Sequence, residues 1–188
     1  MRKLAQCQVF LATLLLALGA QAQIEETRTL SREDGSSVTY TLRTFPADAH
    51  LLRPDVKPDP ASALDTAKLI YLHLSDGDIE GAALLSNSPK RRYEVLREYR
   101  ESVGEADFKR VFAQYLAPEN RLLAEIAIDN RRLLVWDLRE GAKQIAGQYF
   151  VEVEGTYLID DVPNEQRTRL RWVLEAYRSG KIPLTPSN

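Results

Sequence analysis

Residues 122–138 read LLAEIAIDNRRLLVWDL, two apolar runs separated by Asp129-Asn130-Arg131. In the first run, residues 122–128, every second side chain from Leu122 to Ile128 is apolar, and the side chains between them include Glu125. This alternation is typical of a strand with one face on a core and the other partly covered. The second run, residues 133–138, is also typical of a strand, and the Asp-Asn pair favours a tight turn. The stretch therefore predicts an antiparallel β-hairpin.

Further strands and helices flank this hairpin. Residues 145–154 alternate in the same way, and Gly155 permits a turn into a short strand at residues 156–159. Apolar residues recur at helical spacing in four other stretches, residues 62–74, 79–85, 90–117 and 163–179. Asp78 is expected to cap the second of these helices, and Gly104 to kink or interrupt the third. Helices followed by an antiparallel meander predict an α+β fold, with helices packed on one face of a curved sheet.

Two features precede that domain. Residues 24–46 place β-branched residues on both sides of Asp34-Gly35, which is typical of a hairpin whose strands are half-solvated or complete the sheet. Four prolines between positions 46 and 60 predict an extended connector. The expected organisation has four parts: residues 1–22 as a signal peptide, 23–60 as hairpin extension and connector, 61–182 as the α+β domain and 183–188 as a tail.

The first 22 residues have the three parts of a secretory signal peptide. Arg2 and Lys3 precede an apolar run, and Ala20-Gln21-Ala22 forms a small-x-small cleavage site. The run is shorter than the roughly 20 apolar residues that cross a bilayer. Cys7 precedes most of the apolar core, which argues against a lipid anchor on that cysteine. We expect cleavage after Ala22 and export to the periplasm or the medium, with no transmembrane span in the cleaved chain.

Cleavage would also change the chemistry of the chain. Cys7 is the only cysteine, so disulfides and thiol catalysis would be excluded. Loss of Arg2 and Lys3 would move the formal net charge from −2 to −4, which gives no strong attraction to nucleic acid. Lys90-Arg91-Arg92 opens a basic helix flank, but interleaved glutamates favour a solvated face over a nucleic-acid site.

The two histidines are weak candidates for catalytic residues. His50 lies in the proline-rich connector, whereas His73 precedes Asp76 and Asp78 near the end of the first helix. A His–Asp pair of His73 with Asp76 or Asp78 could act as a general base in a pocket, although capping and turn formation are the favoured roles. The sequence has neither a Gly-x-Ser-x-Gly elbow nor a phosphate-binding glycine loop, and too few ligands for structural zinc. We therefore expect no cofactor and no metal.

Aromatic residues and a carboxylate pair are the remaining candidates for a site. Five aromatic residues could line an apolar ligand pocket, although core packing is their commoner role: Tyr71, Trp136, Tyr149, Tyr157 and Trp172. Asp160-Asp161 could bind a cation near a strand end. An N-cap for the closing helix is the favoured role of this pair, because Pro163 suits a first helical turn.

The helix, the Gly77-Asp78 break and the second helix between Ala67 and Leu85 resemble the opening of NTF2-like domains. The resemblance covers about residues 62–160. The chain departs from the pattern because no clear strand separates its second and third helices, and its closing helix is additional. The resemblance implies a cone-shaped fold that encloses a pocket. It does not choose between enzymes and binding modules, because the superfamily contains both.

Three functions stay open at this point. The favoured one is an exported envelope protein without catalysis, which binds a protein or a small apolar ligand through its sheet or its N-terminal hairpin. One alternative is a small-molecule hydrolase or isomerase with an NTF2-like pocket. The other is a structural subunit of an envelope assembly, whose mark would be a large apolar patch.

Overall fold

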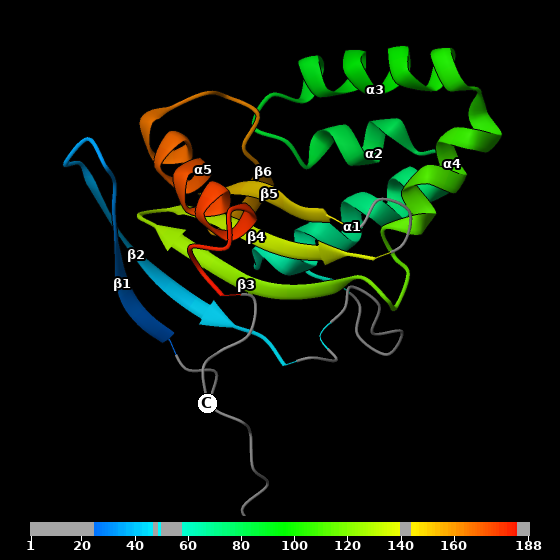
Figure 1. Cartoon of the computed structure of the whole chain (residues 1–188). Coiled ribbons are helices and arrows are strands. Elements are labelled where there is room, and N and C mark those ends of the chain that lie inside the picture. The colour runs from blue at the N-terminus through cyan, green and yellow to red at the C-terminus, as the bar shows by residue number, and fades with distance from the viewer. Residues whose placement is uncertain (1–24, 47–48, 50–57, 140–143, 184–188) are drawn as a thin grey trace, which may run out of the picture.

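The computed structural model describes residues 25–46, 49, 58–139 and 144–183 of the 188-residue chain. Within them, six strands form one antiparallel sheet in the order β1-β2-β3-β4-β5-β6, and of the five helices α1 and α5 pack directly on it (Figure 1). The strands are β1 (Glu25–Ser31), β2 (Ser37–Thr44), β3 (Arg121–Ile128), β4 (Arg131–Leu138), β5 (Gln144–Val153) and β6 (Thr156–Ile159). The helices are α1 (Ala63–Asp76), α2 (Ile79–Leu84), α3 (Pro89–Val103), α4 (Glu105–Gln114) and α5 (Glu165–Arg178). The predicted α+β class is confirmed.

The predicted signal peptide and most of the proline-rich connector, including His50, lie outside the described residues. No helix in the described part of the chain is both long enough and apolar enough to cross a membrane.

Local sequence explains where the helices begin and end. The Ser62 side chain accepts the N–H of Asp65 at the start of α1, and Gly77 ends that helix with a φ of 84°. Asp78 caps α2, as predicted. Gly104 also has a φ of 84°, a conformation that favours glycine, and it separates α3 from α4. The interruption predicted at Gly104 is therefore confirmed, and it divides this stretch into two helices.

The sheet is covered on both faces. Along β4, Leu133 and Val135 belong to one hydrophobic core, whereas Leu134 and Trp136 belong to the other. Helix α5 packs on the first face, and α1 to α4 form the layer on the second (Figure 1). The helices that precede the meander share one face, and the closing helix, for which no face was predicted, covers the other because β4 offers apolar side chains on both of its sides.

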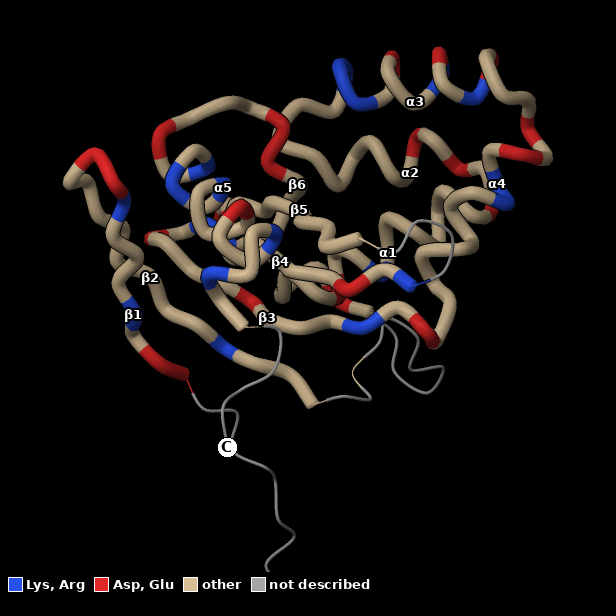
Figure 2. Tube along the Cα trace, viewed as in Figure 1, with Lys and Arg blue, Asp and Glu red and all other residues tan. Residues whose placement is uncertain are grey.

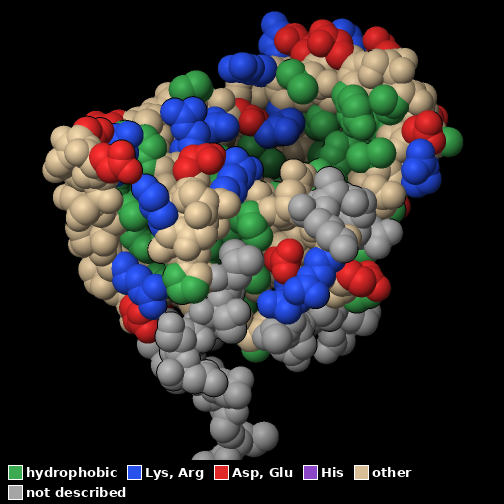
Figure 3. All heavy atoms as spheres, viewed as in Figure 1, with side chains coloured by type: hydrophobic (Ala, Val, Ile, Leu, Met, Phe, Trp, Pro, Cys, Tyr) green, Lys and Arg blue, Asp and Glu red, His purple; other side chains and the backbone are tan. Residues whose placement is uncertain are grey.

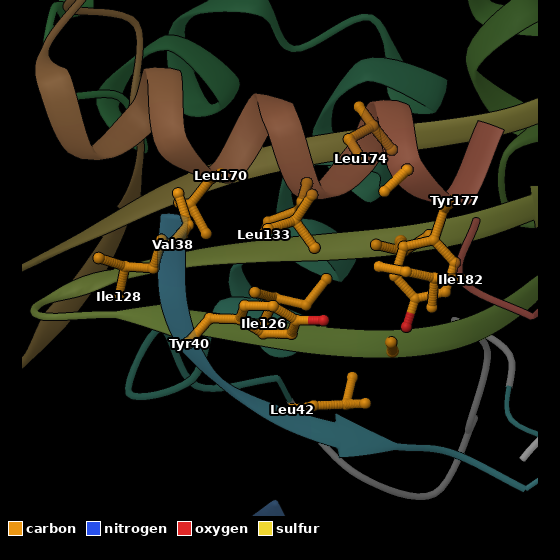
Figure 4. Close-up of a cluster of buried hydrophobic side chains, with 14 of the residues drawn as sticks. Val38, Tyr40, Leu42, Ile126, Ile128, Leu133, Leu170, Leu174, Tyr177 and Ile182 are labelled. Carbon is orange, nitrogen blue, oxygen red and sulfur yellow. The ribbon is translucent and has the colours of Figure 1, made fainter. Parts of the chain in front are cut away.

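The core under α5 joins the N-terminal hairpin to the end of the chain. Strand β2 pairs with β3 and turns Val38, Tyr40 and Leu42 toward α5 (Figure 4). Gly147 of β5 permits the close approach of the helix, since a Cβ at this position would lie 2.6 Å from Cδ2 of Leu174. The hairpin thus completes the main sheet, while β1 at its margin is largely exposed.

Because Tyr177 is buried in this core, the protein is expected to lose stability at alkaline pH. Burial raises the pKa of its phenol to about 12, above the usual value of about 10. Between these two values the unfolded chain loses a proton that the folded chain keeps, so the free energy of unfolding falls as the pH rises. We expect Tyr177 to account for a loss of about 2 kcal/mol from pH 10 to pH 12, in addition to the losses from other buried tyrosines with a raised pKa. Urea unfolding across this range measures it, and a Tyr177→Phe variant with the same slope would contradict the assignment.

Candidate functional site

The predicted His–Asp pair forms at the junction of α1 and α2. Nδ1 of His73 lies 2.7 Å from Oδ2 of Asp78, and Oδ1 of Asp78 accepts the N–H of Gly81 at 2.8 Å. The Gly81 N–H is the main cause that lowers the pKa of the Asp78 carboxyl, and His73 adds to it. A side chain at position 81 would collide with both partners, so glycine makes room for the pair.

This pair lies at the surface. The side chains of His73 and Asp78 are 35% and 47% exposed, and Asp76 is exposed at the end of α1. Neither His73 nor Asp78 lines any of the three cavities described below. The contacts of the pair are those of a helix cap and a turn, which tie α1 to α2.

Two of the predicted ligand residues meet on the α1 side of the sheet. Nε1 of Trp136 donates to Oε1 of Gln148 at 2.9 Å, and Nε2 of Gln148 donates to the Tyr71 hydroxyl at 2.6 Å. The Tyr115 ring stacks on Tyr71 with centroids 4.7 Å apart. Burial raises the pKa of the Tyr71 phenol. The cavity between these groups measures about 20 Å³, which is room for about one water molecule.

Hydrophobic side chains gather over the α2–α4 part of the molecule, next to a hollow (Figure 3). The rings of Tyr99 in α3 and of Phe108 and Phe112 in α4 contact one another, and Phe108 is fully buried. These contacts consolidate the helical layer.

The other predicted aromatic residues lie elsewhere. The Tyr157 hydroxyl donates to Oε2 of Glu152 at 3.1 Å. Tyr149 packs in the core under α5, where the Arg167 guanidinium lies 5.1 Å from its ring. Trp172 of α5 carries the Arg32 guanidinium 4.2 Å above its ring. The five aromatic residues therefore do not line one pocket.

Asp160 and Asp161 pair with arginines, and the prediction that they cap the closing helix is wrong. The side chain of Asn164 caps α5. Oδ2 of Asp160 accepts Nε of Arg131 at 3.0 Å, and Asp161 accepts two donors of Arg92. The carboxylates are neutralised by guanidinium groups, which leaves no bare pair for a cation. Among the described residues, no group of three or more His, Cys, Asp or Glu side chains could hold a metal ion.

Three arginines of the basic flank of α3 contact other groups within the molecule. Besides the pair of Arg92 with Asp161, Arg97 lies 3.7 Å from Glu101, and Nη1 of Arg100 donates to the Gly77 carbonyl at 3.4 Å. Acidic and basic positions follow one another along this helix (Figure 2).

A polar cluster on the sheet was missed by the sequence interpretation. Glu125 of β3 lies 3.2 Å from Nη2 of Arg43 and 3.5 Å from Nε of Arg132, and a cavity of about 240 Å³ adjoins all three. Alternation places these residues on one face, but the Arg43–Glu125 contact depends on the pairing register of β2 with β3. Three acidic residues line this cavity with its two arginines, so the cluster does not favour an anion.

A larger groove lies between the hairpin tip and α5. It measures about 610 Å³ and is lined by Leu30, Trp172 and Ala176 together with charged residues of both signs. Lys181 Nζ lies 3.7 Å from Glu33 across it. The groove begins where β1 ends.

The two edges of the sheet differ. At the β6 edge, Ile159 N–H donates to the Leu85 carbonyl at 2.7 Å, and Asn87 N–H donates to the Ile159 carbonyl at 3.0 Å. Tyr157 N–H donates to the Pro60 carbonyl at 2.7 Å, so the chain itself covers this edge. Strand β1 pairs with β2 on its inner side and forms the outer margin of the described sheet (Figure 1). Apart from Leu30, its residues are exposed.

Comparison with known proteins gives no match to a protein-family model, to a curated protein or to a solved structure.

Proposed function

We propose that the chain is an exported envelope protein without catalytic activity, which binds a protein partner by adding the partner's strand to β1. The proposal is carried by the contrast between the covered β6 edge and the β1 edge, beside which no further described strand lies. The unpaired N–H and C=O groups of an edge strand provide main-chain hydrogen bonds for an incoming strand. Export to the periplasm or the medium rests on the signal peptide predicted at residues 1–22.

The ladder between β1 and β2 defines which groups an incoming strand would meet. Arg32 N–H donates to the Ser36 carbonyl at 2.9 Å, and bonded pairs recur at every second residue of an antiparallel ladder. The backbone groups of even-numbered residues in β1 therefore face β2, whereas those of Thr27 and Thr29 face away. The hydroxyls of Thr29 and Thr39 lie 3.1 Å apart, as suits a close, non-bonded pair.

We further propose that the domain is a variant of the NTF2-like cone. The break at Gly77-Asp78 between α1 and α2, followed by an antiparallel sheet, supports this assignment. Helix α5 on the opposite face and the β1–β2 hairpin are additions to the pattern.

Proline at position 27 tests strand addition. Thr27→Pro removes an N–H that faces away from β2, so we expect the hairpin to persist while the edge loses a donor and gains a steric block. The matched control is Thr27→Val, which changes the side chain alone. In pull-downs with tagged protein from an envelope extract, partners of the wild type and of Thr27→Val, an untagged copy of the chain included, should be lost with Thr27→Pro. Recovery of the same proteins by all three, or of no reproducible partner by any, would contradict the proposal.

A further inference from the structure

We infer that the strand added to β1 is β1 of a second copy of the chain, paired antiparallel about a two-fold axis at Thr27. The inference rests on the proposed function, because it requires β1 to be an accepting edge. A two-fold interface of this kind uses the same strand of both copies. The argument for a second copy is the distribution of charge along β1.

Glu26 and Arg28 lie on the same face of β1. Nη2 of Arg28 lies 2.7 Å from Oε2 of Glu26, as expected of residues two apart in a strand. Both side chains are more than 40% exposed, so they are accessible to an incoming strand. Figure 2 shows acidic and basic positions following one another along this strand.

Backbone geometry allows few registers between two copies of β1. Odd-numbered residues must face odd-numbered residues, because only their N–H and C=O groups point outward. A two-fold axis at Glu26 or at Arg28 would set two like charges opposite each other, which is unfavourable. An axis at Thr27 sets each Glu26 opposite the Arg28 of the other copy.

This register sets opposite charges next to each other and also pairs the outward-facing backbone groups of the two strands. The two Glu26 and two Arg28 side chains form a square of alternating charge, and each arginine keeps its own Glu26 as a neighbour. Thr27 pairs with Thr27, and Glu25 pairs with Thr29 in both directions. About six backbone hydrogen bonds would join the strands.

Strand β1 lacks the devices that usually protect an edge. It contains no proline, and its register with β2 runs from residue 25 to residue 31 without a bulge. A protective edge carries like charges that repel any second copy, whereas β1 carries one basic and two acidic residues. The mixed charges make the strand complementary to itself.

Charge reversal tests the register. Glu26→Arg places two positive charges on the edge, and Arg28→Glu leaves it acidic, so each variant should repel itself. We expect the dimer dissociation constant to rise about tenfold or more in each case. An equimolar mixture of the two variants should form a mixed dimer, because positions 26 and 28 are both basic in one variant and both acidic in the other. The measurement is analytical ultracentrifugation of protein recovered after export of the full chain.

The control is Glu25→Arg, whose side chain lies on the other face of β1. It should leave the dissociation constant within about twofold of the wild-type value. A monomeric wild type, unchanged dimers in both reversal variants, or a mixture that stays monomeric would each overturn the inference. If the wild type is monomeric but Thr27→Pro still loses its partner proteins, strand addition stands and the second copy is refuted.

Discussion

Replacing Asp160 with alanine is expected to lower the free energy of unfolding by about 3–5 kcal/mol. The Asp160 side chain is 1% exposed and accepts hydrogen bonds from Arg131, Asn87 and Asn164 at 2.8–3.0 Å. Without the carboxylate, the guanidinium of Arg131 stays largely buried and loses its counter-charge, which is the costly way to break an ion pair. Urea unfolding followed by circular dichroism measures the loss.

Two further variants test whether the loss of stability comes from breaking this ion pair or simply from removing a charge. Glu165→Ala removes an exposed partner of Arg169, and we expect it to cost less than about 1 kcal/mol. Asp160→Leu combined with Arg131→Met replaces both charges, and it should recover much of the loss. A loss for Asp160→Ala no larger than that for Glu165→Ala would refute the structural role of the pair.

The Asp160 cluster also bears on the proposed edge. Asn87 donates to Asp160 through its side chain and to Ile159 through its N–H. The same residue therefore anchors the loop that covers the β6 edge. The ion pair therefore helps to hold the loop that covers the β6 edge, and this cover is one half of the contrast on which the proposed strand addition to β1 rests.

Much of the fold could be predicted because its signals are local. Ser62, Asp78 and Gly77 mark helix ends within a few residues of the hydrogen bonds they make. The Asp-Gly and Asp-Asn turns likewise lie between the strands they join. Asp78 and His73 are five residues apart, so their pairing followed from the chain itself.

The position of α5 could not be predicted in the same way. The spacing of Leu170, Val173 and Leu174 defines an apolar face but does not say which side of the sheet it covers. The signal that was missed is the run Leu133-Leu134-Val135-Trp136 in β4, where both sides of the strand are apolar. A strand of this kind predicts helices on both faces.

Contacts between residues far apart in the sequence determine which side chains meet at each candidate site. Gln148 is 77 residues from Tyr71, and Asp161 is 69 residues from Arg92. Local interpretation assigned Asp161 to a helix cap, because capping needs no distant partner, whereas the arginine pair formed only when α3 approached the end of β6. The cover over the β6 edge depends on the same long-range packing, because Leu85 and Asn87 are far in sequence from Ile159.

Replacing Phe108 with alanine should cost about 3–5 kcal/mol of unfolding free energy. Its ring is 0% exposed and lies 4.8 Å from that of Phe112 and 5.8 Å from that of Tyr99. Truncation would open a void where α4 packs against α1 and α3, and the surrounding rings can fill it only in part. Thermal unfolding should shift downward by roughly 10 °C.

Phe112→Ala is the matched control, because Phe112 lies on the same helix and is only partly buried. We expect it to cost less than half as much as Phe108→Ala, since less apolar surface is lost from the core. Phe108 belongs to the core opposite α5, so pairing through β1 should survive in protein that remains folded. Equal losses from the two variants would mean that α4 is not anchored through Phe108. A dimer lost from folded Phe108→Ala protein would mean that the helical layer, and not β1, holds the second copy.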